Sequence, residues 1–108
     1  MVNELKIANK LIGRNHPPFI IAEMSGNHNQ SLERALEIVV AAAKTGAHAL
    51  KIQTYTPDTM TLDLDEREFH ISDSNSLWAG NSLYKLYGEA YTPWEWHKPI
   101  FERARELG

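Results

Sequence analysis

The stretch that decides the fold is IIAEMSGNHNQSLERALEIVVAAAKTGAHALKIQTY, residues Ile20–Tyr55. An apolar run over 19–24 indicates a buried strand, a helical pattern follows it, and a second apolar run from Ala47 predicts another strand of about six residues. Strand, helix and strand in this order form a βαβ unit. Because the crossover makes the two strands parallel, their carboxyl ends lie at the same edge of the sheet.

The helix between the two strands has clear start and stop signals. Ser31 is the predicted N-cap, Glu33 lies in the first turn, and Gly46 is the predicted residue just beyond the end. The expected apolar stripe consists of Leu32, Leu36, Val39, Val40 and Ala43. We expect this stripe to cover Leu50 and Ile52 of the second strand.

Polar side chains gather where these strands end. Because side chains alternate along a strand, Glu23, Lys51 and Gln53 are expected on the sheet face away from the helix. A carboxylate and an ammonium group at neighbouring strand ends can pair or share a ligand, and the alternative for Glu23 and Lys51 is a buried structural ion pair. Asn27 and His28 follow in the adjacent loop. The alternative for His28 is a structural hydrogen-bonding role.

The flanking segments give weaker signals. Residues 5–12 alternate and predict a short β-ribbon closed near Gly13. No regular element is predicted between residues 55 and 80, and a short helix is expected over 81–87, ending at Gly88.

A stronger helix start lies near the end of the chain. Thr92 is the expected N-cap, Pro93 the first helical residue and Glu95 the capping-box glutamate. Pro99 follows one turn later and predicts a kink or a fresh helix start. The expected apolar face consists of Ile100, Phe101, Ala104 and Leu107.

Composition excludes several classes of protein. The 108 residues have a net charge of −3, scattered basic residues and no cysteine, which argues against nucleic-acid binding and excludes disulfides and thiolate metal sites. No apolar stretch approaches the roughly 18 residues that a membrane span needs. The acidic run DLDERE, residues 63–68, lacks the spacing of a calcium-binding hand and predicts a solvated face. We therefore expect a cytoplasmic protein that binds neither nucleic acid nor membrane.

Two parallel strands leave the polar face around Glu23 without a cover. Parallel sheets are almost always buried on both faces, so more protein is expected across this face. The sequence thus predicts an α/β fold in which residues 1–108 form the N-terminal part of a (βα)8 TIM barrel. These residues would supply the first two βα units, preceded by the β-ribbon.

Two motifs point to a known family. A first strand ends A-E-x-x-x-N-H at Ala22–His28, and the second reads K-x-Q-T at Lys51–Thr54. With this pair of motifs a helix apart, the chain resembles the sialic acid synthase family, whose members condense phosphoenolpyruvate with an N-acetylated amino sugar. Within the family, KIQTYTPDTMT and LYKLYGEAYTPWEWHKPIFERARELG are more similar to the pseudaminic acid synthases.

The resemblance implies roles for the matching residues. Lys51 would hold the carboxylate and phosphate of phosphoenolpyruvate, and Glu23 would hydrogen-bond the sugar hydroxyls and assist proton transfer. Gln53 would contact the sugar, with Asn27 and His28 on the loop that rims the site. Glu23 and Lys51 are thus the expected catalytic residues.

The resemblance also implies features of a full-length enzyme. It implies a divalent metal, manganese or magnesium, with ligands outside this chain, together with a homodimer and a C-terminal antifreeze-like domain that these residues do not include. The expected reaction joins phosphoenolpyruvate to a 2,4-diacetamido-2,4,6-trideoxy hexose, giving pseudaminic acid and phosphate, and the 108-residue chain alone would be inactive. The alternatives are an N-acetylneuraminate or legionaminic acid synthase of the same family and, from another class, a non-catalytic oligomerising or binding module.

Overall fold

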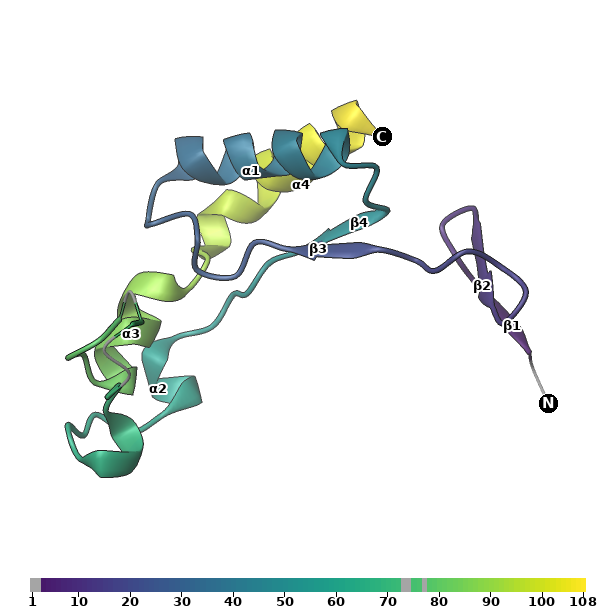
Figure 1. Cartoon of the computed structure of the whole chain (residues 1–108). Coiled ribbons are helices and arrows are strands. Elements are labelled where there is room, and N and C mark those ends of the chain that lie inside the picture. Colours follow the sequence, from purple (N-terminus) through teal and green to yellow (C-terminus); the bar gives the residue numbers. More distant parts are fainter. Residues whose placement is uncertain (1–2, 73–74, 77) are drawn as a thin grey trace.

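The protein is described by a computed structural model that covers residues 3–72, 75–76 and 78–108 (Figure 1). Two two-stranded sheets, four α-helices and two 3-10 turns follow one another in these residues. In chain order they are β1 (Glu4–Ile7), β2 (Lys10–Gly13), β3 (Ile21–Glu23), α1 (Leu32–Lys44), β4 (Ala49–Lys51), α2 (Pro57–Met60), η1 (Arg67–Phe69), α3 (Leu83–Ala90), η2 (Trp94–Trp96) and α4 (His97–Leu107).

The predicted βαβ unit is confirmed. Strands β3 and β4 pair in parallel, and the register sets Glu23 directly opposite Lys51. Each strand is only three residues long, so the expected six-residue second strand was too long. The pairing continues beyond the ladder through single hydrogen bonds, from the Met24 N–H to the Lys51 carbonyl at 3.0 Å and from the His48 N–H to the Ile20 carbonyl at 2.8 Å. Among the described residues each strand has a neighbour on one side only, so the other edge of each strand is unpaired.

Helices α1 and α4 pack together over one face of this sheet (Figure 1). The buried core consists of Met24, Ala35, Val39 and Ile100. Leu50 and Ile52 pack against this core, as predicted. The stripe on α1 is turned relative to the prediction, since Ala35 and Ile38 take part while Ala43 is exposed. Helix α1 packs against α4 as well as against the sheet. The helical spacing of its apolar residues does not by itself predict this second contact.

The ends of α1 follow the sequence signals. The Ser31 hydroxyl accepts a hydrogen bond from the Arg34 N–H at 3.1 Å, which satisfies one of the free donors of the first turn. Gly46 lies just beyond the helix with a φ of 83°, a left-handed conformation that glycine adopts without strain. Both capping predictions are confirmed.

Replacing Ser31 with alanine is expected to lower the free energy of unfolding by about 1 kcal/mol, because the Arg34 N–H loses its acceptor. Denaturant unfolding of both proteins measures this difference. Ser31→Asp keeps an acceptor at the cap and should restore most of the loss. Equal stability of Ser31→Ala and the parent chain would contradict the capping role.

Helix α3 differs from its predicted bounds at both ends. It begins at Leu83, because the hydroxyl of Ser82 caps it by accepting from the Lys85 N–H at 3.2 Å. Gly88 lies inside the helix rather than at its end. The chain turns extended at Tyr91.

The predicted cap at Thr92 is wrong. This side chain is fully buried and its hydroxyl has no hydrogen-bond partner among the described residues, while its N–H donates to the Gln53 carbonyl at 2.7 Å. A 3-10 turn, η2, comes first, and α4 then starts at His97. Pro99 thus falls in the first turn of a fresh helix, one of the two predicted outcomes.

The apolar face of α4 is only partly as expected. Ile100 is buried and Ala104 packs against the core, but Phe101 is half exposed and Leu107 is also exposed. The Phe101 ring lies against the ring of His97 at 5.7 Å between centroids instead of entering the core.

The predicted β-ribbon is confirmed as the antiparallel hairpin β1–β2, which turns at residues 8–9 and lies away from the other elements (Figure 1). The segment between β4 and α4 holds more structure than predicted, because α2 and η1 form within it and α2 packs against α3. Residues 73–74 and 77 of this segment lie outside the described residues. The acidic run 63–68 is exposed wherever its burial is described, as predicted.

In the part of the chain that the structure describes, no helix has the length and apolar character that crossing a bilayer requires.

Candidate functional site

Glu23 and Lys51 meet at the carboxyl ends of β3 and β4. The Lys51 ammonium donates to Glu23 Oε1 at 3.0 Å. In these residues the Glu23 side chain is 57% exposed and the Lys51 side chain is 55% exposed. An exposed pair of this kind contributes about 0–1 kcal/mol, and a charged ligand can separate it at little cost.

A cavity of about 690 Å³ lies beyond these strand ends. Asn27 reaches it from the loop between β3 and α1, and Gln53 reaches it from the residues after β4. The opposite wall comes from α3 and the turn before it. The lining residues are Ser25, Gly26, Asn27, Asn29, Arg34, Gln53, Tyr55, Trp78, Asn81, Leu86, Tyr87, Glu89 and Ala90.

Apart from His28, the structure divides the predicted site residues into two groups. Glu23 and Lys51 form a charged pair on the sheet, whereas Gln53 and Asn27 line the cavity beside it. Gln53 connects the two groups, because it follows Lys51 by two residues.

Aromatic and amide side chains give the cavity its chemistry. The ring of Tyr55 stands edge-on to that of Tyr87, with 5.5 Å between centroids and 89° between planes. Burial, with a smaller contribution from Tyr87, raises the pKa of Tyr55, so its hydroxyl stays a neutral donor. Among the described residues, the side-chain amides of Gln53 and Asn81 have no protein hydrogen-bond partner. Such a wall suits a neutral ligand that has both hydroxyl and amide groups.

Sequence reasoning missed part of this wall. Tyr55 had a usable signal, since it continues the alternation of Lys51 and Gln53 along the same side of the chain. Trp78 and Asn81 had none, because a turn distant in the sequence brings them to the cavity.

With this geometry established, comparison with known proteins decides the family. The NeuB family model matches residues 38–108, which is more than half of the chain. The chain belongs to the NeuB family.

Individual NeuB-family relatives are similar over most of the chain. The pseudaminic acid synthase of Campylobacter jejuni subsp. jejuni serotype O:2 is 54% identical over 90 residues, which are 83% of this chain and 26% of that protein. The pseudaminic acid synthase of Helicobacter pylori is 50% identical over 91 residues, 84% of this chain and 26% of that protein. The chain thus spans about a quarter of the length of these relatives.

A solved structure supports the fold of this NeuB-family chain. The crystal structure of the spore coat polysaccharide biosynthesis protein SpsE from Bacillus subtilis superimposes with a TM-score of 0.64 and 32% sequence identity. The superposition covers 96% of this chain and 25% of the SpsE chain.

His28 lies beneath the loop of this NeuB-family chain rather than at the cavity. Its side chain is fully buried, and its Nδ1 accepts a hydrogen bond from the Gln30 N–H at 3.0 Å. The ring also stands edge-on to Trp96 at 5.1 Å. Burial lowers the pKa of His28, although the nearby backbone of Ala90 and Tyr91 opposes the shift. These contacts favour the structural alternative for His28 over direct substrate binding.

Acid is expected to destabilise the chain through His28. The unfolded imidazole titrates near pH 6.5, whereas burial lowers the folded pKa, so the contribution to stability is complete above about pH 6.5 and falls as the pH drops below it. The slope is at most about 1.4 kcal/mol per pH unit, since one proton is involved.

Denaturant unfolding between about pH 5 and about pH 8 measures this effect. His28→Asn removes the titrating group and should show a flatter dependence than the parent chain, with the other four histidines as an internal background. The same slope in both proteins would contradict the assignment.

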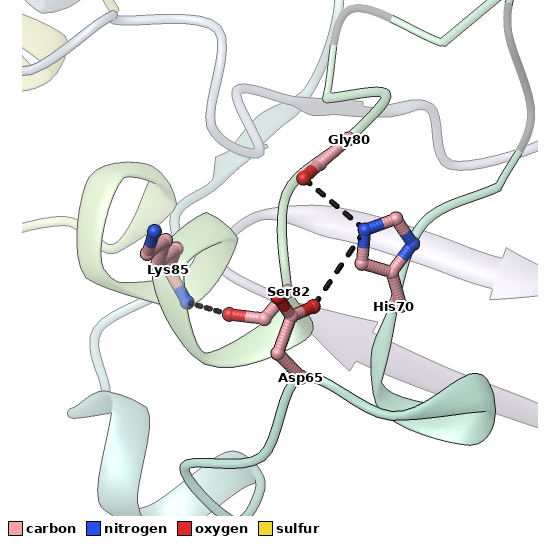
Figure 2. Close-up of polar contacts among 5 residues, drawn as sticks. All are labelled: Asp65, His70, Gly80, Ser82 and Lys85. Carbon is pink, nitrogen blue, oxygen red and sulfur yellow. Dashed lines mark hydrogen bonds and ion pairs between the residues drawn. The ribbon is translucent and has the colours of Figure 1, made fainter.

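Figure 2 shows a second histidine that holds the turn before α3. His70 Nε2 lies 3.2 Å from the Gly80 carbonyl oxygen and 3.6 Å from Asp65 Oδ1 (Figure 2). Because a carbonyl oxygen only accepts, Nε2 bears the hydrogen. His70 also forms a β-bridge with Ser82, and these contacts hold the turn that brings Asn81 to the cavity.

His48 and His97 serve the fold in similar ways. His48 Nδ1 accepts from the Ile20 N–H at 2.9 Å, and His97 Nε2 contacts the Thr54 hydroxyl at 2.5 Å. Over residues 3–72, 75–76 and 78–108, no group of three or more histidine, aspartate or glutamate side chains is placed to hold a metal ion. A divalent metal therefore does not fit these residues.

Proposed function

We propose that this chain forms part of the active site of a pseudaminic acid synthase. The observation that carries the proposal is the exposed pair of Lys51 and Glu23, joined at 3.0 Å where two parallel strands end beside a cavity that amide and aromatic side chains line in part. The 54% identity to a pseudaminic acid synthase supports the same assignment. The substrates are phosphoenolpyruvate and a 2,4-diacetamido-2,4,6-trideoxy hexose, with altro configuration at the sugar.

Lys51 binds the anionic substrate. Its ammonium group is a compact charge that pairs with carboxylate or phosphate oxygens, and its present partner Glu23 is exposed and easily displaced. Glu23 then accepts hydrogen bonds from the sugar hydroxyls, because an ionised carboxylate has acceptor sites only.

The cavity receives the sugar. Gln53 and Asn27 supply amide groups on the side nearest the strand ends, and Asn81 supplies another across the cavity. The rings of Tyr55 and Tyr87 cover the less polar faces of the sugar. This set of groups suits acetamido substituents, which both donate and accept hydrogen bonds.

The reaction is a condensation at the open-chain aldehyde. A carbon–carbon bond forms between C3 of phosphoenolpyruvate and the aldehyde carbon, water adds at C2, and the bond from C2 to the phosphate oxygen breaks to release inorganic phosphate. Lys51 offsets the negative charge of phosphoenolpyruvate, and Glu23 orients the sugar and assists transfer of the proton that the attacking water loses and the aldehyde oxygen gains. The (βα)8 barrel, the homodimer and the cytoplasmic location remain parts of this proposal.

Incubation of the whole protein that contains this chain with phosphoenolpyruvate and the sugar tests the proposal. Phosphate release is expected only when both are present, with pseudaminic acid as the product by mass spectrometry and NMR. The manno-configured isomer and a hexose with a single acetamido group serve as competing substrates for the legionaminate and N-acetylneuraminate alternatives. Preference for either would overturn the assignment to pseudaminic acid.

The alternative from another class is a non-catalytic oligomerising module. Exposed apolar side chains on the hairpin and on β3 favour it, because such surfaces recruit partners. They are Leu5, Ile7, Leu11 and Ile21. A discrete homo-oligomer of the chain that does not respond to phosphoenolpyruvate would support this alternative over a synthase.

A further inference from the structure

The loop between β3 and α1 has an unusual backbone. Asn29 and Gln30 adopt left-handed conformations, with φ of 49° and 59°, which residues with a side chain seldom adopt in succession. Because this conformation is unfavourable for residues with a side chain, contacts with the rest of the protein must stabilise it. The loop matters because Asn27 and Asn29 both line the cavity.

His28 stabilises this loop conformation. Its side chain is fully buried, and its Nδ1 accepts from the Gln30 N–H at 3.0 Å, at the residue with the left-handed backbone. The edge-on contact with Trp96 fixes the plane of the ring. Because Nδ1 accepts, Nε2 bears the hydrogen in the neutral ring, and this buried group has no hydrogen-bond partner among the described residues.

The side chain of Gln30 connects the loop to the opposite wall of the cavity. Its side-chain amide donates to the carbonyls of Glu89 at 2.6 Å and Tyr91 at 3.1 Å, where α3 ends. Helix α3 supplies the far side of the cavity, so the loop and the helix end are tied together at one residue. The ring that sets the Gln30 backbone thereby sets the separation of the two walls.

We propose that His28 is a positioning residue for the sugar cavity. It acts through the backbone N–H of Gln30 on the loop and through the side-chain amide of Gln30 on the end of α3. Its kinetic consequence rests on the proposed function, whereas its effect on the loop does not. A merely structural role would leave the cavity unchanged in whatever fraction of the protein is folded.

Two substitutions separate positioning from packing. His28→Phe keeps a ring against Trp96 and removes the unpartnered Nε2–H, but it has no acceptor for the Gln30 N–H. His28→Asn loses the ring but can place its side-chain oxygen close to where Nδ1 lies. If His28 only packs, His28→Phe is the milder change, and if it positions the loop, His28→Asn is the milder one.

The whole protein should then respond as follows. In His28→Phe the backbone N–H of Gln30 is expected to exchange hydrogen about 10-fold faster or more. The KM for the sugar is expected to rise about 10-fold, while the KM for phosphoenolpyruvate stays within about two-fold of the parent value. His28→Asn should restore both values toward the parent protein. Parent-like exchange and sugar KM in His28→Phe would overturn the proposal.

A third variant keeps the test decisive if His28→Phe does not fold. Gln30 is exposed, so Gln30→Met leaves the core intact while removing the donor to the Glu89 and Tyr91 carbonyls. The same rise in sugar KM is expected, and its absence would overturn the link between the walls. If the protein has no synthase activity at all, the proposed function fails, and the exchange rate of the Gln30 amide still decides the role of His28.

Discussion

Replacement of Lys51 by methionine is expected to lower kcat/KM for phosphoenolpyruvate by about 100-fold or more in the whole protein. Methionine keeps a long unbranched side chain but has no charge, so the carboxylate and phosphate of the substrate lose their cationic partner at the strand ends. Steady-state kinetics with varied phosphoenolpyruvate measure the loss, and phosphate release is the readout.

In the 108-residue chain the same substitution should hardly change stability, because the Lys51–Glu23 pair is exposed there and contributes about 0–1 kcal/mol. Lys98→Met is the matched control, since Lys98 is 84% exposed on α4 and its partner Glu102 is 4.0 Å away. This control should keep kcat/KM within about two-fold of the parent. Normal phosphoenolpyruvate kinetics in Lys51→Met would remove Lys51 from the proposed site.

Replacement of Gly26 by alanine is expected to destabilise the chain by about 1–3 kcal/mol and to distort the cavity. A Cβ atom at Gly26 would lie 2.8 Å from the Cβ of Ala90 and 3.1 Å from its Cα. The second atom belongs to the backbone, so no side-chain rotation relieves the contact. The loop and the end of α3 must move apart, and the cavity lies between them.

Gly88→Ala makes the same chemical change where there is room. The nearest atom to a new Cβ at Gly88 is Pro57 Cγ at 3.7 Å, an ordinary contact, and the residue lies within α3. Alanine favours a helix over glycine, so this variant should be more stable by about 0.5–1 kcal/mol. Denaturant unfolding of both variants is the measurement, and changes of the same sign would contradict the close approach at Gly26.

The part of the fold that sequence could predict is the part in which local signals and long-range packing agree. Ser31 and Gly46 cap α1 as expected, and the alternation along the strands correctly placed Glu23 and Lys51 on one sheet face, where they pair. Capping at Thr92 failed because the residue is buried where the chain returns to β4, and this tertiary contact with Gln53 overrode a good local pattern.

The far wall of the cavity was beyond sequence reasoning for a different reason. Trp78 and Asn81 reach the cavity through a turn that an isolated bridge between His70 and Ser82 holds in place. A contact of this kind has no period and no cap, so the pattern of residues between 55 and 80 does not reveal it. Tyr55 alone could have been found, by extending the alternation beyond Gln53.

The hydrogen bond from the Thr92 N–H to the Gln53 carbonyl has a consequence for how such a protein can change. This bond joins the two ends of the segment 54–91, which contains α2 and α3, while β3, β4, α1 and α4 lie outside the segment. Doubling the length of a flexible loop costs only about 0.6 kcal/mol of closure entropy. We therefore expect that residues 54–91 can be exchanged between relatives at the Gln53–Thr92 hydrogen bond, which would change the far wall of the cavity and leave the core of α1 and α4 unchanged.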